Sequence, residues 1–146
     1  MRWIVDTNII SETRKPKPNR NVVEWISATP TEQLFTTDVT IAEILYGIEM
    51  QPDFVKAKSL AIWLEANVRP LFGGRILAID EIILLRWRII SGKLQVAREP
   101  TPPGDLLIAA IAIENSCCVA TRDVAPFVSC GIPTLNPFTG ERFNGA

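Results

Sequence analysis

Short apolar runs alternate along the chain with longer stretches in which apolar residues recur at helical spacing. The runs predict strands over residues 3–5, 33–36, 75–79, 117–121 and 133–135. The longer stretches predict helices over residues 20–28, 40–50, 53–68, 80–97 and 103–115. Several predicted strands are apolar on both faces, which is typical of a parallel sheet covered by helices. Strands separated by helices indicate right-handed βαβ units, so we predict a three-layer α/β fold.

The chain has 146 residues, no internal repeat and no linker-like segment, so we expect a single domain over residues 1–146. The tail 136–146 is rich in Gly, Asn and Phe, and we expect it to be partly loose. No apolar run reaches the roughly 18 residues that a membrane-spanning helix needs. Asp6 interrupts the first apolar run, so no secretory signal is expected. We therefore expect a cytoplasmic protein without membrane association.

The amino-acid composition excludes several classes of functional site. The net charge is −1, so no global basic field favours nucleic-acid binding, and any such activity needs a local positive rim. There is no histidine, which excludes His-based zinc sites, Ser-His-Asp triads and histidine general bases. The cysteines Cys117, Cys118 and Cys130 are odd in number and are expected to be reduced structural thiols.

Four acids stand in otherwise apolar sequence: Asp6 ends the first strand, Glu43 and Asp105 fall in the first turns of predicted helices, and Asp123 follows a later strand. The carboxyl ends of parallel strands share one edge of a sheet, so we expect the four to converge there. Carboxylates gathered away from water need a cation to stay ionised together. The pattern therefore favours a divalent metal site, with phosphodiester cleavage as its chemistry.

Each acid taken alone has an ordinary alternative. Thr40-Ile-Ala-Glu43 matches a capping box, which would give Glu43 a purely structural role. Asp105 would stabilise a helix N-terminus through the helix dipole. Asp6 and Asp123 would serve as turn formers. The metal-site interpretation rests on the four acids taken together.

The motifs resemble those of the PIN domain family, and most of all its VapC/FitB group of toxin ribonucleases. The resemblance is carried, in order, by Asp6-Thr7-Asn8, Thr40 to Glu43, Asp105 to Ala110, Ala120 to Asp123 and Phe127. The runs Asn8 to Glu12 and Asn136-Pro137-Phe138 support the narrower group. The chain departs from the pattern in the rigid Pro102-Pro103-Gly104 before Asp105 and in Pro126, both of which bear on pocket shape.

The resemblance implies a PIN-like αβα fold with a mostly parallel central sheet of about five strands. It implies a metal-dependent endoribonuclease toxin that binds Mg²⁺ or Mn²⁺ through Asp6, Glu43, Asp105 and Asp123, in a pocket lined by Thr7, Asn8 and Thr121. It also implies a homodimer, and a cognate VapB/FitA-like antitoxin that fills the site and binds operator DNA on behalf of the complex. The alternative is a catalytically idle PIN fold that acts only with an antitoxin in repression.

Candidate RNA contacts are the basic side chains of Arg14, Lys15, Lys17, Arg20 and Arg122, although the first four would equally suit an ordinary solvated loop. Among four tryptophans, Trp87 alone is expected at the surface, at a dimer or antitoxin interface, with the others in the core. A different phosphotransfer family would favour an Asp-x-Asp pair after the first strand, where Thr7 and Asn8 stand instead. A nucleotide-binding domain is disfavoured because no Gly-rich loop follows that strand.

Overall fold

The computed structural model describes residues 1–146, apart from the side chain of Val96. Its sheet consists of β1 (Trp3–Val5), β2 (Leu34–Thr37), β3 (Ile76–Leu77), β4 (Cys118–Ala120), β5 (Thr134–Leu135) and β6 (Arg142–Phe143). The strand order is β3-β2-β1-β4-β5-β6, and all neighbouring pairs are parallel except β5 with β6. The sheet is therefore mostly parallel as predicted, with β6 as an additional strand that the sequence pattern did not reveal.

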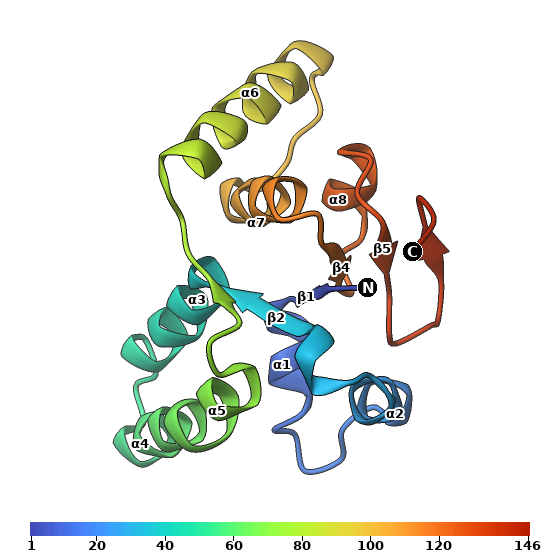
Figure 1. Ribbon diagram of the computed structural model, residues 1–146. Coiled ribbons are helices and arrows are strands. Elements are labelled where there is room, and N and C mark those ends of the chain that lie inside the picture. The colour runs from blue at the N-terminus through green and yellow to red at the C-terminus, as the bar shows by residue number, and fades with distance from the viewer.

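Helices cover both faces of the sheet (Figure 1). They are α1 (Thr7–Glu12), α2 (Arg20–Ala28), α3 (Asp38–Glu49), α4 (Phe54–Trp63), α5 (Arg69–Phe72), α6 (Glu81–Ala97), α7 (Pro103–Glu114) and α8 (Ala125–Ser129). A short 3₁₀ turn spans Thr31–Gln33, and a π-helical turn, Leu64–Val68, joins α4 to α5. The helices α6, α7 and α8 lie on one side of the sheet, and α1 to α5 lie on the other (Figure 1).

Alternating side chains of β1 explain the two cores. Ile4 packs with α7 residues such as Ile108 and Ile111, whereas Val5 packs with Ile9 and Phe72 on the opposite face. All six side chains are at most 2% exposed. Successive residues of a strand point to opposite faces, so this strand is apolar throughout because both its faces are covered. The predicted three-layer αβα architecture is confirmed.

Some helices differ from the predicted ones in where they begin or in being too short to predict. α3 begins at Asp38 because the Thr37 hydroxyl caps it, accepting a hydrogen bond from the Thr40 N–H at 3.1 Å. The capping-box interpretation of Thr40 and Glu43 is therefore wrong, and Glu43 lies in the second helical turn rather than the first. The short helices α1, α5 and α8 were not predicted, since four to six residues carry too little periodicity.

The C-terminal segment folds back on the sheet instead of remaining loose. The Asn136 N–H donates to the Glu141 carbonyl at 2.9 Å, and Gly140, at φ +81°, completes the turn into β6. A glycine suits that left-handed position because it has no Cβ to clash. Ala146 packs against the core cluster around Trp3. Local Gly and Asn content therefore marked a tight turn rather than a loose tail.

The tryptophans lie largely within the packing, including the one assigned to the surface. Trp3 and Trp25 meet edge to face with ring centroids 5.6 Å apart, and Trp63 packs against the core beneath α3 to α5. Trp87 packs against the opposite core, and its Nε1 is buried. Trp87, Trp25 and Trp63 are all half-buried, so the predicted contrast between a surface Trp87 and three core tryptophans holds only for Trp3. All three cysteines are free thiols, and none of the described helices has the length and hydropathy to cross a bilayer.

Candidate active site

The pairing of β1 with β4 creates the centre of the site. Val5 and Ala120 are register partners at the ends of these parallel strands, and the Asp6 N–H donates to the Ala120 carbonyl at 3.0 Å. Asp6 then becomes the N-cap of α1, with its side chain accepting from the Thr7 N–H at 2.8 Å. Its exposed fraction is only 5%. One short strand therefore delivers a buried carboxylate to the carboxyl edge of the sheet.

A hydrogen-bond network joins the ends of β1 and β4. The fully buried Thr121 hydroxyl donates to Asp6 Oδ2 at 2.8 Å and accepts from the Asp123 N–H at 3.1 Å. Asn8 Nδ2 lies 3.2 Å from the Thr121 hydroxyl and 3.4 Å from Asp123 Oδ2. Asn8 Oδ1 in turn accepts from the Arg122 N–H at 3.1 Å. Thr121 and Asn8 thus hold the two aspartates in register.

Glu43 approaches the same place from α3. The Thr7 hydroxyl donates a hydrogen bond to Glu43 Oε2, linking α3 to the start of α1. On the other side, a methyl group at Gly104 would lie 3.2 Å from Glu43 Oε1. The absence of a side chain at position 104 therefore lets the first turn of α7 come close to the glutamate. Asp105, the next residue, is the acid in that turn.

The pKa values show that the four carboxyl groups share one field. Burial, followed by the negative charges of Asp6, Glu43 and Asp123, raises the pKa of Asp105 from 3.8 to about 6. Burial is also the main reason that the pKa of Asp6 is raised, with Glu43 and Asp123 adding to the effect and hydrogen bonds from Thr121 and Thr7 opposing it. The predicted convergence of the four acids is therefore what the structure shows.

The donor chemistry of this cluster fits a hard cation. Carboxylate, hydroxyl and amide oxygens are the ligands that Mg²⁺ prefers, and no sulfur ligand is involved. Within the described part of the chain, no three Asp, Glu or Cys side chains already stand arranged to hold a metal ion. Glu43 is instead bonded to Thr7, Asp6 to Thr121 and Asp123 to Asn8. The residue types therefore suit the ion, and each of these three acids is held by a hydrogen bond from a neighbouring side chain.

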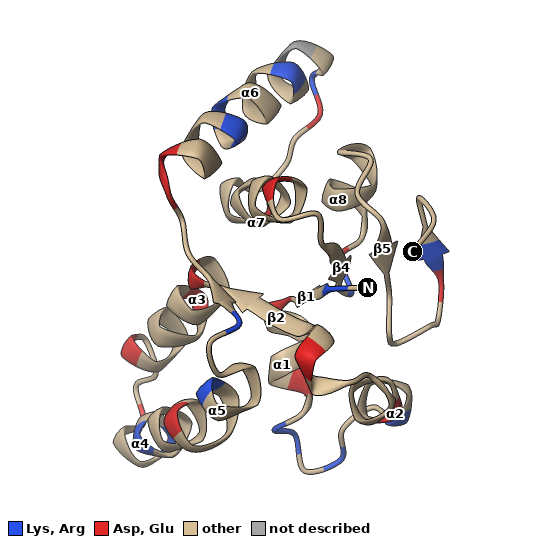
Figure 2. Ribbon diagram, in the orientation of Figure 1, with Lys and Arg blue, Asp and Glu red and all other residues tan. Residues whose placement is uncertain are grey.

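The candidate RNA contacts fall into two places. Arg14, Lys15 and Lys17 lie on the loop between α1 and α2, where Figure 2 shows its basic segments, and Arg20 opens α2. Lys15 Nζ pairs with Glu12 at 2.9 Å and Arg20 Nε with Glu24 at 2.7 Å, while Arg14 lies over the Trp63 ring. Arg122 lies apart from these, directly beside Asp123.

The sequence did not indicate a functional role for two residues of the site region. Gly104 appeared only as part of a rigid segment, and its closeness to Glu43 depends on how α7 packs beside α3. Phe138 appeared only as part of a family motif, yet its ring lies 3.9 Å from the Arg122 guanidinium carbon. No periodicity or spacing signal would have shown either contact.

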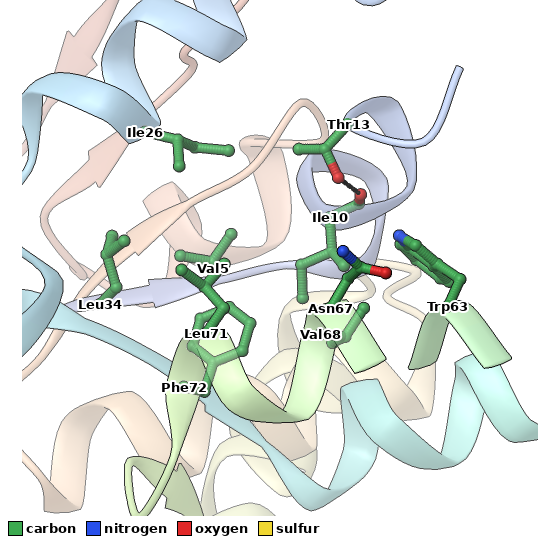
Figure 3. A pocket seen from close by; sticks show the side chains of 10 residues that line it. All are labelled: Val5, Ile10, Thr13, Ile26, Leu34, Trp63, Asn67, Val68, Leu71 and Phe72. Atoms are coloured by element: carbon green, nitrogen blue, oxygen red, sulfur yellow. Dashed lines mark hydrogen bonds between the residues drawn. The ribbon is translucent and has the colours of Figure 1, made fainter. Parts of the chain in front are cut away.

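A small apolar pocket lies on the α1 to α5 side of the sheet (Figure 3). Its volume is about 40 Å³, and its walls include Val5, Ile10, Trp63 and Phe72. Asn67 contributes an amide from the π-helical turn, but no ionisable side chain lines the cavity. The cavity therefore belongs to the packing, and the chemistry lies at the acidic edge of the sheet.

The fold is thus a mostly parallel αβα sandwich with a cluster of four carboxylates at the carboxyl edge of its sheet. Residues 3–127 match the model of the PIN domain family, and the chain belongs to that family. The resemblance seen in the motifs is thereby confirmed.

Similar proteins extend over nearly the whole chain. It is 36% identical to plasmid stability protein StbB of Pseudomonas syringae, 33% to toxin FitB of Neisseria gonorrhoeae and 32% to VapC ribonuclease Y4jK of Sinorhizobium fredii. Each alignment covers 92% of this chain and 96–97% of the relative. Among solved structures, FitAcB from Neisseria gonorrhoeae gives a TM-score of 0.87 at 33% identity, covering 93% of this chain and 98% of that one. The structure of FitAB bound to an IR36 DNA fragment gives a TM-score of 0.86 at 32% identity, covering 93% of this chain and 95% of that one.

Proposed function

We propose that this protein is a metal-dependent endoribonuclease that acts as the toxin of a toxin–antitoxin pair. The observation that carries the proposal is the convergence of Asp6, Glu43, Asp105 and Asp123, where burial, followed by the neighbouring negative charges, raises the pKa values of Asp6 and Asp105. Such an arrangement is unfavourable for the protein alone and becomes favourable when a cation occupies it. The relative named a VapC ribonuclease supports RNA as the substrate class.

The four carboxylates would hold Mg²⁺ or Mn²⁺, with Asn8 and Thr121 orienting the two aspartates. A bound divalent ion supplies two effects: it makes water more acidic and it polarises the scissile phosphate. Asp105 or Asp6 would orient the attacking water, and the pKa of Asp105, raised to about 6 by burial and the neighbouring carboxylates, is a property of the metal-free site. Asp6, held by Thr121 and the Thr7 N–H, has the fixed geometry that a ligand needs.

A groove beside the acids supports an antitoxin partner. The hollow has a volume of about 540 Å³ and is lined by Asp38, Val39, Ala42, Glu43, Tyr46, Ile79, Gly104 and Leu107. Its apolar walls and acidic end suit a peptide segment that carries apolar residues and one basic side chain. FitB is named a toxin, and FitAB was solved with DNA. We propose by analogy a FitA-like antitoxin, a toxin homodimer, and contact with operator DNA only through the antitoxin, all in the cytoplasm.

The test is incubation of the purified chain, taken as a single domain over residues 1–146, with total cellular RNA in Mg²⁺ or Mn²⁺. EDTA and Asp6→Asn serve as controls, and Asp38→Asn is the matched variant because Asp38 is an exposed carboxylate just outside the cluster. We expect discrete fragments with the wild type and Asp38→Asn, and none with EDTA or Asp6→Asn. Intact RNA despite confirmed metal binding would instead favour a binding module that acts with an antitoxin.

A further inference from the structure

The acidic cluster leaves an electrostatic problem for an RNA substrate. Each phosphodiester carries a negative charge, and it must approach a site built from four carboxylates in a chain of net charge −1. A bound cation offsets part of that charge, but it does not orient the strand on either side of the cleaved bond. A fixed basic side chain beside the site would do so.

Most of the candidate RNA-binding side chains already contact other groups of the protein. Lys15 and Arg20 are paired with acids of their own helical neighbourhood, at 2.9 and 2.7 Å. The Arg14 guanidinium carbon lies 5.7 Å from the centroid of the Trp63 ring. The charges of Lys15 and Arg20 are therefore partly neutralised by neighbouring acids, and the Arg14 guanidinium lies against an aromatic ring of the protein.

Arg122 is placed differently, because its backbone is part of the acidic site. It lies between Thr121 and Asp123, and its N–H donates to Asn8 Oδ1 at 3.1 Å. This hydrogen bond uses only main-chain atoms of Arg122, so the position of its Cα is set by the same network that orients Asp6 and Asp123. The side chain is exposed and starts from the rim of the site.

An aromatic ring orients the guanidinium. The Arg122 Cζ lies 3.9 Å from the centroid of Phe138, close enough for a cation–π contact. The ring is itself held: the Phe138 N–H donates to Asn136 Oδ1 at 3.0 Å, and its carbonyl accepts from Asn21 Nδ2 at 2.8 Å. No carboxylate among the described residues forms an ion pair with Arg122. Stacking on the ring leaves the guanidinium N–H groups at its edge available to an anion.

We propose that Arg122, stacked on Phe138, binds a backbone phosphate of RNA next to the cleaved bond. The assignment of RNA rests on the proposed function, whereas the phosphate chemistry rests on the preformed guanidinium. Arginine suits this role because its planar fork can donate two parallel hydrogen bonds to phosphate oxygens. Phe138 is a positioning residue, since it acts on the substrate only through Arg122.

The experiment measures binding separately from cleavage. A fluorescein-labelled single-stranded RNA of random sequence is titrated with the full chain carrying Asp105→Asn, which prevents turnover, in Mg²⁺ and at several KCl concentrations. Arg122→Gln, Arg122→Lys and Phe138→Leu are compared in that background by fluorescence anisotropy. Arg88→Gln is the matched control, because it removes an exposed arginine charge on α6 that is not among the candidate RNA contacts. Melting curves check that every variant is folded.

Removing one phosphate contact should lower the slope of log K against log salt by about 0.7 and weaken binding about fivefold at about 0.1 M salt. We expect that result for Arg122→Gln, whereas Arg88→Gln should match the parent. Arg122→Lys and Phe138→Leu should keep the salt slope but bind more weakly, because the charge remains and its orientation is lost. An Arg122→Gln variant with the parent's affinity and slope, or a parent that does not bind RNA, would overturn the inference.

Failure of this inference and failure of the nuclease are distinguishable. If wild-type protein cleaves total RNA and Arg122→Gln cleaves with the same KM, the phosphate role of Arg122 is refuted and the nuclease stands. If no cleavage occurs but RNA binding still depends on Arg122, the phosphate site stands and the nuclease is refuted.

Discussion

Asp105→Asn should make the metal-free protein more stable while weakening its response to metal. The native state raises the pKa of this carboxyl from 3.8 to about 6, so ionised Asp105 is disfavoured by folding. At about 1.4 kcal/mol per pH unit, the difference corresponds to about 3 kcal/mol for a fully enclosed group. Asp105 is only partly enclosed, and solvent screening reduces the figure to about 1.5 kcal/mol. The lost interaction with the α7 dipole subtracts about 0.5 kcal/mol, leaving a net gain of about 1 kcal/mol.

The gain should depend on pH in a defined direction. Below pH 3.8, Asp105 is protonated in both the native and the unfolded state, so its ionisation does not change the free energy of unfolding. Between pH 3.8 and about 6, the unfolded chain releases the proton while the native state keeps it, so wild-type stability falls as the pH rises. Above about pH 6, Asp105 is ionised in both states, and the full loss of wild-type stability is present. The advantage of Asp105→Asn should therefore be small near pH 4 and reach about 1 kcal/mol at pH 8, or about 2–4 °C in the melting temperature.

The assay is thermal unfolding followed by circular dichroism in EDTA at both pH values, then repeated with Mg²⁺. Asp38→Asn is the matched control, because Asp38 also occupies the first turn of a helix but is exposed. It should lose about 0.3–1 kcal/mol, since only the dipole interaction disappears. With Mg²⁺ in excess the order of wild type and Asp105→Asn should reverse. An Asp105→Asn variant that is no more stable than wild type at pH 8 in EDTA would refute the shared-field reasoning.

Three further substitutions or conditions test the same site. Mg²⁺ at about 100 times its dissociation constant should stabilise the wild type by about 2.7 kcal/mol in thermal melts, and an equal shift in Asp6→Asn would contradict the assigned ligand. Thr121→Val should cost about 1–3 kcal/mol in urea unfolding and weaken Mg²⁺ binding in calorimetry, because Asp6 loses a hydrogen bond that lowers its pKa; Thr121→Ser should restore both. Gly104→Ala should raise helix stability by about 0.5 kcal/mol but displace Glu43 and lower Mg²⁺ affinity, and unchanged affinity would show that Glu43 is not constrained by this contact.

The strength of the sequence prediction lay in elements with a long or unmistakable pattern. The apolar runs of β1 and β4 and the apolar stretch of α7 are read directly from the chain, because burial on all sides removes polar residues. Short local motifs, by contrast, led to a wrong prediction of where a helix begins. Thr40 and Glu43 fit a capping box, but Thr37 stands one turn earlier with its hydroxyl free to cap, so the helix starts there.

The sequence by itself determined the αβα class and singled out the four acids, because an acid within an otherwise apolar segment is a local feature. Only the tertiary structure decided what those acids experience. The parallel pairing of β1 with β4 brings Asp6 and Asp123 to one edge, and the packing of α7 beside α3 brings Asp105 and Glu43 to them. The raised pKa values and the stacking of Arg122 on Phe138 arise from contacts between residues far apart in the chain. Burial and charge proximity are properties of that arrangement, and no local pattern encodes their magnitude.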